Sequence, residues 1–218
     1  MAVGTGGRAD ARNRLIAAAT RAFAEHGYHT TTTRDIAAEA GMSPAAVYVH
    51  HSSKEELLFL ITQQGHDQAL QVLRAAAPAD ADPVHRLQAT VRAFTLWHAD
   101  HHTAARVVQY ELAALSPGHR RAIAVRRREI DQHMREVIAD GVRRGVFDVP
   151  DVPGTSLALL SMAIDVARWY RDDRERTAES VADLYGDLAV RMVRTGATTG
   201  TATEATQGPG STMAAPGP

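Results

Sequence analysis

The sequence holds 218 residues with a formal net charge of −1, and it contains no cysteine. The missing cysteine excludes disulfide scaffolds, thiolate metal sites and cysteine nucleophiles, and the balanced charge excludes polyanion binding driven by overall charge alone. Hydrophobic residues make up 44% and aromatic residues only 5%. Alanine, the strongest helix former, supplies much of the apolar share, so the composition predicts an all-α globular fold. Neither a signal peptide nor a membrane span is recognisable, which predicts a cytoplasmic location.

The N-terminal segment begins with small residues and continues as a helix. Residues 1–9 are Gly-rich, as expected of a flexible arm. From Asp10, apolar side chains recur at helical spacing as far as Phe23, and Gly27 follows as a stop signal. The pattern predicts a first helix between these limits.

Two short helices should follow. The threonines before residue 34 supply an N-cap for a helix over 34–40, and Gly41 ends it. Ser43 is a strong N-cap, and Pro44 suits the first position of another helix that runs to about Val49.

A longer helical region occupies the rest of the chain. A serine pair caps a long helix from near Lys54, and Pro78 and Pro83 bracket a break that is a candidate boundary between two parts of the chain. Beyond the break, periodicity predicts helices near 83–100, 102–115, 118–144, 154–173 and 177–194. Residues 196–218 lack periodicity and are predicted to form a disordered tail.

The helix pair on either side of Gly41 has the pattern of a helix-turn-helix. Two steeply crossing helices need a small residue where they touch, which Ala37 supplies, and a turn residue that tolerates positive φ, which Gly41 supplies. The second helix would then present an outward ridge of mostly small residues, which fits a DNA major groove; it consists of Pro44, Ala45, Ala46 and Tyr48, with His50 just beyond. An ordinary helical hairpin has the same spacing.

The residues after this ridge favour DNA over a plain hairpin. The stretch from Tyr48 to Lys54 places a phenol, imidazoles and an ammonium at the start of the next helix. Such groups and helix N-terminal amides are common partners of phosphates.

At these positions the sequence resembles the tetracycline-repressor (TetR) family of bacterial regulators. The resemblance rests on 23–28, on 32–41 and on Tyr48 to Leu57. It implies a three-helix helix-turn-helix head over 10–56 and a helical ligand-binding and dimerisation body over 57–195.

The resemblance also implies the DNA contacts. They map onto Thr33, Arg34, Ser43, Pro44, Ala45, Ala46, Tyr48, His50 and Lys54. Arg34 is expected to contact a base, since arginine reaches guanine O6 and N7 together. Thr33, Tyr48 and Lys54 are expected to hold phosphates.

The last two predicted helices carry apolar stripes that predict a dimer interface. The stripes consist of Leu157, Leu160 and Ile164, and of Val181, Leu184, Leu188 and Met192. Such spacing also marks an ordinary core face. In the resembled family the corresponding helices pair with those of a second subunit, which implies a homodimer on a palindromic operator.

A histidine cluster, His98 with His101 and His102, raises an alternative class of function. An i,i+3 pair could hold zinc in a helical metal-dependent enzyme. The cluster also lies at a predicted helix end, where solvated histidines complement the dipole, and no catalytic motif accompanies it. We therefore expect no metal, no cofactor and no enzyme. An arginine-rich run over 120–128 is interpreted as a solvated helix face.

The segment 162–171 combines an apolar wall with aromatic and guanidinium groups, as a ligand pocket requires. Together with 141–147 it resembles acyl-CoA-responsive members of the family. The predicted ligand-binding residues are Phe59, Gln63, Phe94, Trp97, Tyr110, Asp165, Arg168 and Trp169. The resulting hypothesis is a repressor whose apo dimer fits the operator and which a hydrophobic or acyl-CoA-like inducer releases.

Overall fold

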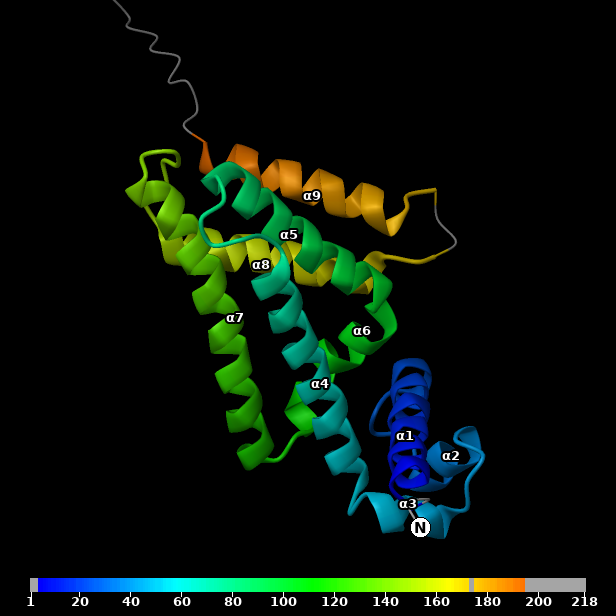
Figure 1. Ribbon diagram of the computed structural model, residues 1–218. Helices are drawn as coiled ribbons and strands as arrows, with labels where there is room; N and C mark the ends of the chain where they lie inside the picture. Colours follow the sequence, from blue (N-terminus) through cyan, green and yellow to red (C-terminus); the bar gives the residue numbers. More distant parts are fainter. Residues whose placement is uncertain (1–3, 173–174, 195–218) are drawn as a thin grey trace, which may run out of the picture.

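A long helix, α4 (Lys54–Ala75), joins the two parts of the molecule in the computed structural model, which describes residues 4–172 and 175–194. In Figure 1 the first three helices lie at one end of α4, and α8 and α9 lie across the other end. Within the described ranges every regular element is a helix, which confirms the predicted all-α fold. None of those helices has the length and hydropathy needed to cross a bilayer. The predicted tail, 196–218, lies outside the described residues.

Three helices form the N-terminal head: α1 (Gly4–His26), α2 (Thr33–Glu39) and α3 (Pro44–His50). Helix α1 starts before Asp10, so the prediction that residues 1–9 are a flexible arm is wrong for 4–9.

The short helices of the head are fixed by their ends. Thr32 and Asp35 form a reciprocal capping box at the start of α2. Gly27 and Gly41, with φ of 79° and 65°, make the two turns that a side chain would strain. The sequence therefore places both breaks correctly, because each depends on a single local residue.

The body contains the remaining helices. They are α4, α5 (Pro83–Asp100), α6 (His102–Tyr110), α7 (Pro117–Arg143), α8 (Val152–Trp169) and α9 (Ala178–Val193), with a short 3₁₀ turn η1 (Leu112–Ala114) after α6. The predicted helix over 102–115 is thus split at Glu111. Helix α5 packs along α9, where the bare backbone of Gly186 lies against Gln88.

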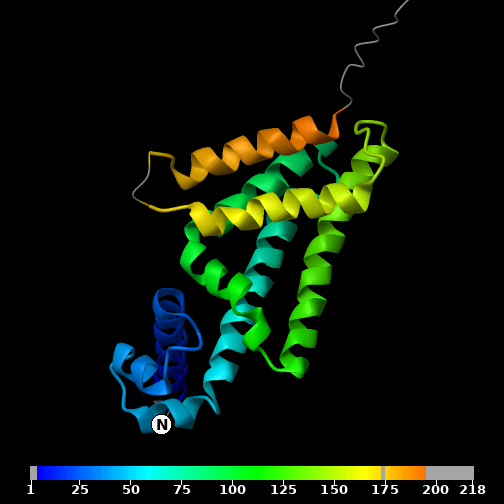
Figure 2. The ribbon, with the colours of Figure 1, turned by 180° about the vertical axis from the view of Figure 1, so that it is seen from behind.

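Hydrophobic packing continues from the head into the body. One core cluster includes Phe23 and Ile36 of the head, Leu57 of α4, Val108 of α6 and Ile123 of α7. Apolar contacts therefore cross the predicted domain boundary after residue 56. The view from behind in Figure 2 shows α6 between α1 and the layer of α8 and α9.

Polar contacts reinforce this junction. The Glu55 carboxylate accepts hydrogen bonds from the Ser116 amide at 2.7 Å and from His119 Nδ1 at 2.8 Å. Burial tends to raise the pKa of Glu55, but these bonds and the His119 charge outweigh it and lower the pKa. The Tyr28 amide donates to Glu111 at the end of α6, at 3.1 Å. These contacts hold the first turn of α4 to the start of α7 and hold the head to the end of α6.

The end of α7 offers a test of this packing. A Cβ at Gly141 would overlap the buried ring of Phe147, whereas a Cβ at Gly118 on the same helix meets nothing within 4 Å. We expect Gly141→Ala to lower the free energy of unfolding by about 1–3 kcal/mol. Gly118→Ala should leave it unchanged or slightly higher, since alanine favours helix. Urea unfolding measures both, and equal stabilities would contradict the described packing.

Candidate nucleic-acid interface and ligand cavity

The turn between α2 and α3 presents α3 as an exposed ridge. The Met42 amide donates to the Ala37 carbonyl at 2.8 Å, which closes the turn, and Ser43 caps α3 by accepting from the Ala46 amide. Val47 is buried against the head core, while Pro44, Ala45 and Ala46 remain exposed or half-buried. The predicted division of α3 into an inner and an outer face is confirmed.

Polar side chains flank this ridge. The hydroxyl of Thr33, at the start of α2, lies 3.2 Å from that of Tyr48, near the end of α3, so the two helices present two oxygens together. Tyr48 is 60% exposed, and Arg34 is exposed beside Thr33. Three of the predicted contacts therefore share one accessible surface. The side chain of His50, also predicted as a contact, lies outside the part that the structure describes.

Lys54 has a different position from the predicted one. Its Nζ donates to the carbonyls of Tyr28 and Thr31 at 2.7 Å each and lies 3.5 Å from the carbonyl of His29. It also lies 4.2 Å from the centre of the Tyr28 ring. An ammonium has three donors, and all three point into the turn after α1. The expected phosphate contact is therefore replaced by an internal one that holds α4 to the head.

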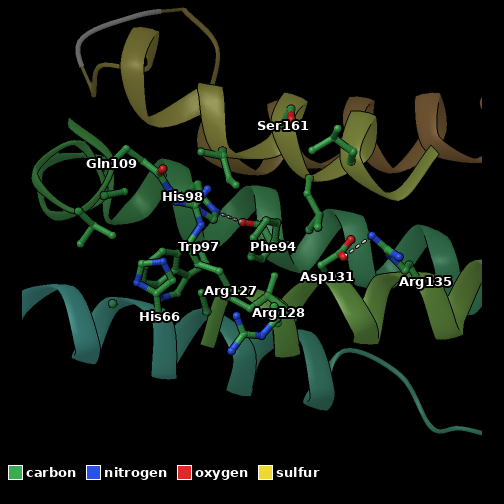
Figure 3. Close-up of a pocket in the computed structure, with 18 of the residues that line it drawn as sticks. His66, Phe94, Trp97, His98, Gln109, Arg127, Arg128, Asp131, Arg135 and Ser161 are labelled. Carbon is green, nitrogen blue, oxygen red and sulfur yellow. Dashed lines mark hydrogen bonds and ion pairs between the residues drawn. The ribbon is translucent and has the colours of Figure 1, made fainter. Parts of the chain in front are cut away.

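A cavity of about 480 Å³ lies in the body between α4, α5, α6, α7 and α8. Figure 3 shows the side chains around it. Phe94 and Trp97 line this cavity, as predicted, together with Ala69, Val108 and Leu160. The walls are mostly apolar, which suits a hydrophobic ligand.

Cationic side chains gather at one side of the cavity. Arg127 and Arg128 of α7 line it and are exposed. Arg127 also lines a neighbouring groove of about 310 Å³, whose other residues include Arg106 and Arg168. Arg106 Nε is buried without a hydrogen-bond partner among the described residues. The apolar chamber and the cationic groove are therefore neighbours that share wall residues, among them Arg127.

Three predicted ligand residues belong to the groove and not to the chamber. They are Tyr110, Asp165 and Arg168. Arg168 binds the Asp165 carboxylate through two hydrogen bonds, of 2.7 and 2.8 Å. This pairing lowers the pKa of Asp165. The segment 162–171 therefore contributes polar groups to the rim of the site.

The other predicted ligand residues lie elsewhere. The Phe59 ring stacks on His119 with centroids 3.8 Å apart, at the junction with the head. Trp169 packs beside Tyr170 in a separate core cluster. Neither Trp169 nor Gln63 is among the residues that line the chamber or the groove. The structure therefore places these three residues away from the chamber and the groove, because helical periodicity shows which face is apolar without showing which neighbour covers it.

Sequence reasoning missed most of the cavity wall, and two of the residues that it missed are His66 and His98. Both are buried side chains of the wall, from α4 and α5. His98 was considered only as part of a metal cluster. Instead, His98, His101 and His102 each direct Nδ1 to a backbone carbonyl. Among the residues that the structure describes, no group of His, Cys, Asp or Glu is arranged to hold a metal ion.

The predicted dimer residues separate into two sets. Leu157, Leu184 and Met192 are exposed apolar side chains, at 66%, 38% and 45%. Leu160 and Val181 are buried within the subunit, so their assignment to a subunit interface is wrong. The half-buried residues Ile164 and Leu188 lie between these extremes.

Comparison with known proteins establishes the family. Residues 15–61 match the model of bacterial regulatory proteins of the tetR family, and residues 80–193 match the tetracyclin repressor-like C-terminal domain. The chain is 30% identical to the HTH-type transcriptional repressor KstR2 of Rhodococcus jostii strain RHA1, over 83% of this chain and 90% of that protein. This chain therefore belongs to the TetR family of bacterial transcriptional regulators, and not to an enzyme family.

Solved structures support the same conclusion. A bacterial regulatory protein in the tetR family from Rhodococcus RHA1 superimposes with a TM-score of 0.81 at 42% identity, over 84% of this chain and 97% of that one. The regulator AibR, solved in complex with isovaleryl coenzyme A and operator DNA, gives a TM-score of 0.74 at 25% identity, over 84% and 98%.

The internal position of Lys54 makes a prediction that separates support of the fold from DNA contact. Lys54→Met should lower the free energy of unfolding by about 1–3 kcal/mol, because the partly buried carbonyls of Tyr28 and Thr31 lose their charged donor. Arg14→Met, which removes an exposed charge of the same head paired with Asp10, should cost less than about 1 kcal/mol. Thermal or urea unfolding measures both. A direct phosphate contact would instead appear as unchanged stability with weaker salt dependence of duplex binding.

Proposed function

We propose that this chain is a transcriptional repressor that binds a palindromic operator as a homodimer and leaves it when a hydrophobic, acyl-CoA-like ligand fills the cavity. The proposal rests on two features that occur in the same chain. One is the exposed ridge of α3, and the other is an apolar chamber with a cationic rim. Relatives named as repressors and AibR with its coenzyme A thioester support it. Such a regulator works in the cytoplasm, where bacterial DNA lies.

The ridge supports DNA binding through shape and a few polar groups. Pro44, Ala45 and Ala46 are small enough for α3 to enter a major groove, where an alanine methyl meets a thymine methyl. Arg34 is the candidate base contact. Thr33 and Tyr48, with hydroxyls 3.2 Å apart, are the candidate phosphate contacts, and Ser43 and His50 complete the proposed set.

The exposed apolar residues of α8 and α9 support the dimer. Leu157, Leu184 and Met192 would be covered by the same surface of a second copy, and Ile164 and Leu188 would extend the contact. Leu157 and Ile164 also line the cavity, so a second subunit on this face would lie next to the ligand.

The cavity supports an amphipathic ligand. Its apolar walls suit an acyl or polycyclic group, and the guanidiniums of Arg127, Arg128 and Arg106 suit the phosphates of a coenzyme A head. The buried, unpartnered Nε of Arg106 gives the groove a donor for such an oxygen.

The junction supports coupling between ligand and DNA. Val108 of α6 lines the cavity, and α6 ends at Glu111, which holds the Tyr28 amide of the head. Arg127 of α7 lines the cavity as well, and His119 at the start of α7 holds Glu55. A ligand that favours another position of α6 or α7 therefore changes the placement of the head, and operator affinity falls by the difference in ligand binding energy.

Selection of bound sequences from random duplex DNA tests the DNA half of the proposal. The selected site should be palindromic and should bind two chains, as light scattering of the complex would show. Arg34→Ala should weaken binding to that site by about 1–3 kcal/mol and relax base preference at one position in each half. Arg143→Ala, an exposed arginine at the far end of α7, should leave affinity unchanged. Unaltered base preference in Arg34→Ala would exclude the proposed base contact.

Displacement of the selected duplex by medium-chain acyl-CoA tests the ligand half. The double variant Arg127→Ala and Arg128→Ala should need about tenfold or more ligand for the same release, because charge-assisted bonds to phosphate are lost. Arg121→Ala, an exposed arginine of the same helix outside the cavity, serves as control. Equal responses of all three proteins would refute the proposed position of the head group.

A further inference from the structure

Two buried histidines line the cavity, and both have the same hydrogen-bonding pattern. His66 and His98 are only 5% and 3% exposed, and both line the chamber. His66 Nδ1 lies 2.8 Å from the Thr62 carbonyl, and His98 Nδ1 lies 2.8 Å from the Phe94 carbonyl. Because a carbonyl only accepts hydrogen bonds, each Nδ1 carries the proton. In a neutral ring, each Nε2 is then an acceptor.

The surroundings keep both rings neutral. Burial lowers the pKa of His98 to about 4 and outweighs the opposing effect of the bond to the Phe94 carbonyl. Burial also lowers the pKa of His66, with Arg127 contributing in the same direction. Both Nε2 atoms therefore present lone pairs at neutral pH.

Neither lone pair is satisfied by the protein. Within residues 4–172 and 175–194, no side-chain or backbone donor is hydrogen-bonded to Nε2 of His66 or His98. Figure 3 shows the two rings entering the same side of the cavity from α4 and α5. The His98 ring is held edge-on between Phe94 and Trp97, with centroid separations of 4.4 and 4.9 Å. Fixed acceptors in an apolar wall mark a position where a donor belongs.

We propose that the buried part of the ligand carries a hydroxyl group, which donates its one proton to Nε2 of His66 or of His98, so that the cavity selects hydroxylated apolar molecules. The inference rests on the proposed function in placing the ligand in this cavity. A ketone or carboxylate oxygen would meet the two lone pairs without a proton to share. An ammonium group would be disfavoured by the apolar walls and by nearby Arg127 and Arg128. A neutral hydroxyl meets both requirements.

Small rigid probes test this selection without DNA or coenzyme A. 1-Adamantanol and 1-methyladamantane differ by a hydroxyl in place of a methyl group, and 2-adamantanone carries only an acceptor. Binding is followed by the fluorescence of Trp97 in a Trp169→Phe background, since the chain has two tryptophans. We expect the alcohol to bind about tenfold or more tightly than either of the other probes, because neither of them offers a donor to the acceptors that face the cavity.

Variants assign the preference to the histidines. His66→Phe with His98→Phe keeps aromatic rings in the wall and should remove most of the preference for the alcohol. His85→Phe, an exposed position on α5, should keep it. Where the double variant fails to fold, the imidazole ¹⁵N spectrum of the wild-type protein replaces it. Adamantanol, and not methyladamantane, should then shift the Nε2 resonance of a buried histidine as a donated hydrogen bond does.

The outcomes separate this inference from the proposed function. Equal affinities for the three probes, no binding of any probe, or a preference that survives in the double variant would each overturn hydroxyl recognition. If acyl-CoA still released the operator, the proposed function would stand without it. If the alcohol were preferred while acyl-CoA had no effect on DNA, the ligand class of the proposed function would be wrong and hydroxyl recognition would stand.

Discussion

Two adjacent residues at the start of α4, Lys54 and Glu55, hydrogen-bond to different parts of the molecule and thereby connect the head to α7. Lys54 donates into the turn after α1, and Glu55 accepts from Ser116 and His119 at the start of α7. This pair helps to fix the position of the ridge relative to the body. Lys54 bonds the first turn of α4 to the head, and Glu55 bonds the same turn to α7. A change in α7 therefore reaches the head through a single turn of helix.

The cavity uses charge in a complementary way. Its inner wall holds neutral histidines, and its rim holds arginines from several helices. Water solvates the exposed guanidiniums, so their cost in the absence of ligand is small, whereas a charge on the inner wall would oppose folding. One chamber therefore combines an apolar interior with arginines at its rim.

Sequence reasoning succeeded where a feature depends on neighbours along the chain. Gly41 and Ser43 are sufficient to define the turn and the start of α3, and the exposed and buried sides of α3 follow from periodicity. Sequence reasoning failed where the role of a residue depends on contacts with residues distant in the sequence. Lys54 was expected to face DNA, and Leu160 and Val181 were expected to face another subunit, but partners distant in the sequence enclose all three. The roles of His66 and His98 required knowledge of which helices surround them.

The apolar cluster that runs from Phe23 through Leu57 to Ile123 has a consequence for how the protein unfolds. The hydrophobic core of the head includes side chains from α4, α6 and α7. The three head helices therefore do not form a separate core. Amide protons of α1 and of the first half of α4 should then exchange with solvent in one cooperative opening. We therefore expect loosening of the body to extend to the head, so that the chain unfolds as a single cooperative unit.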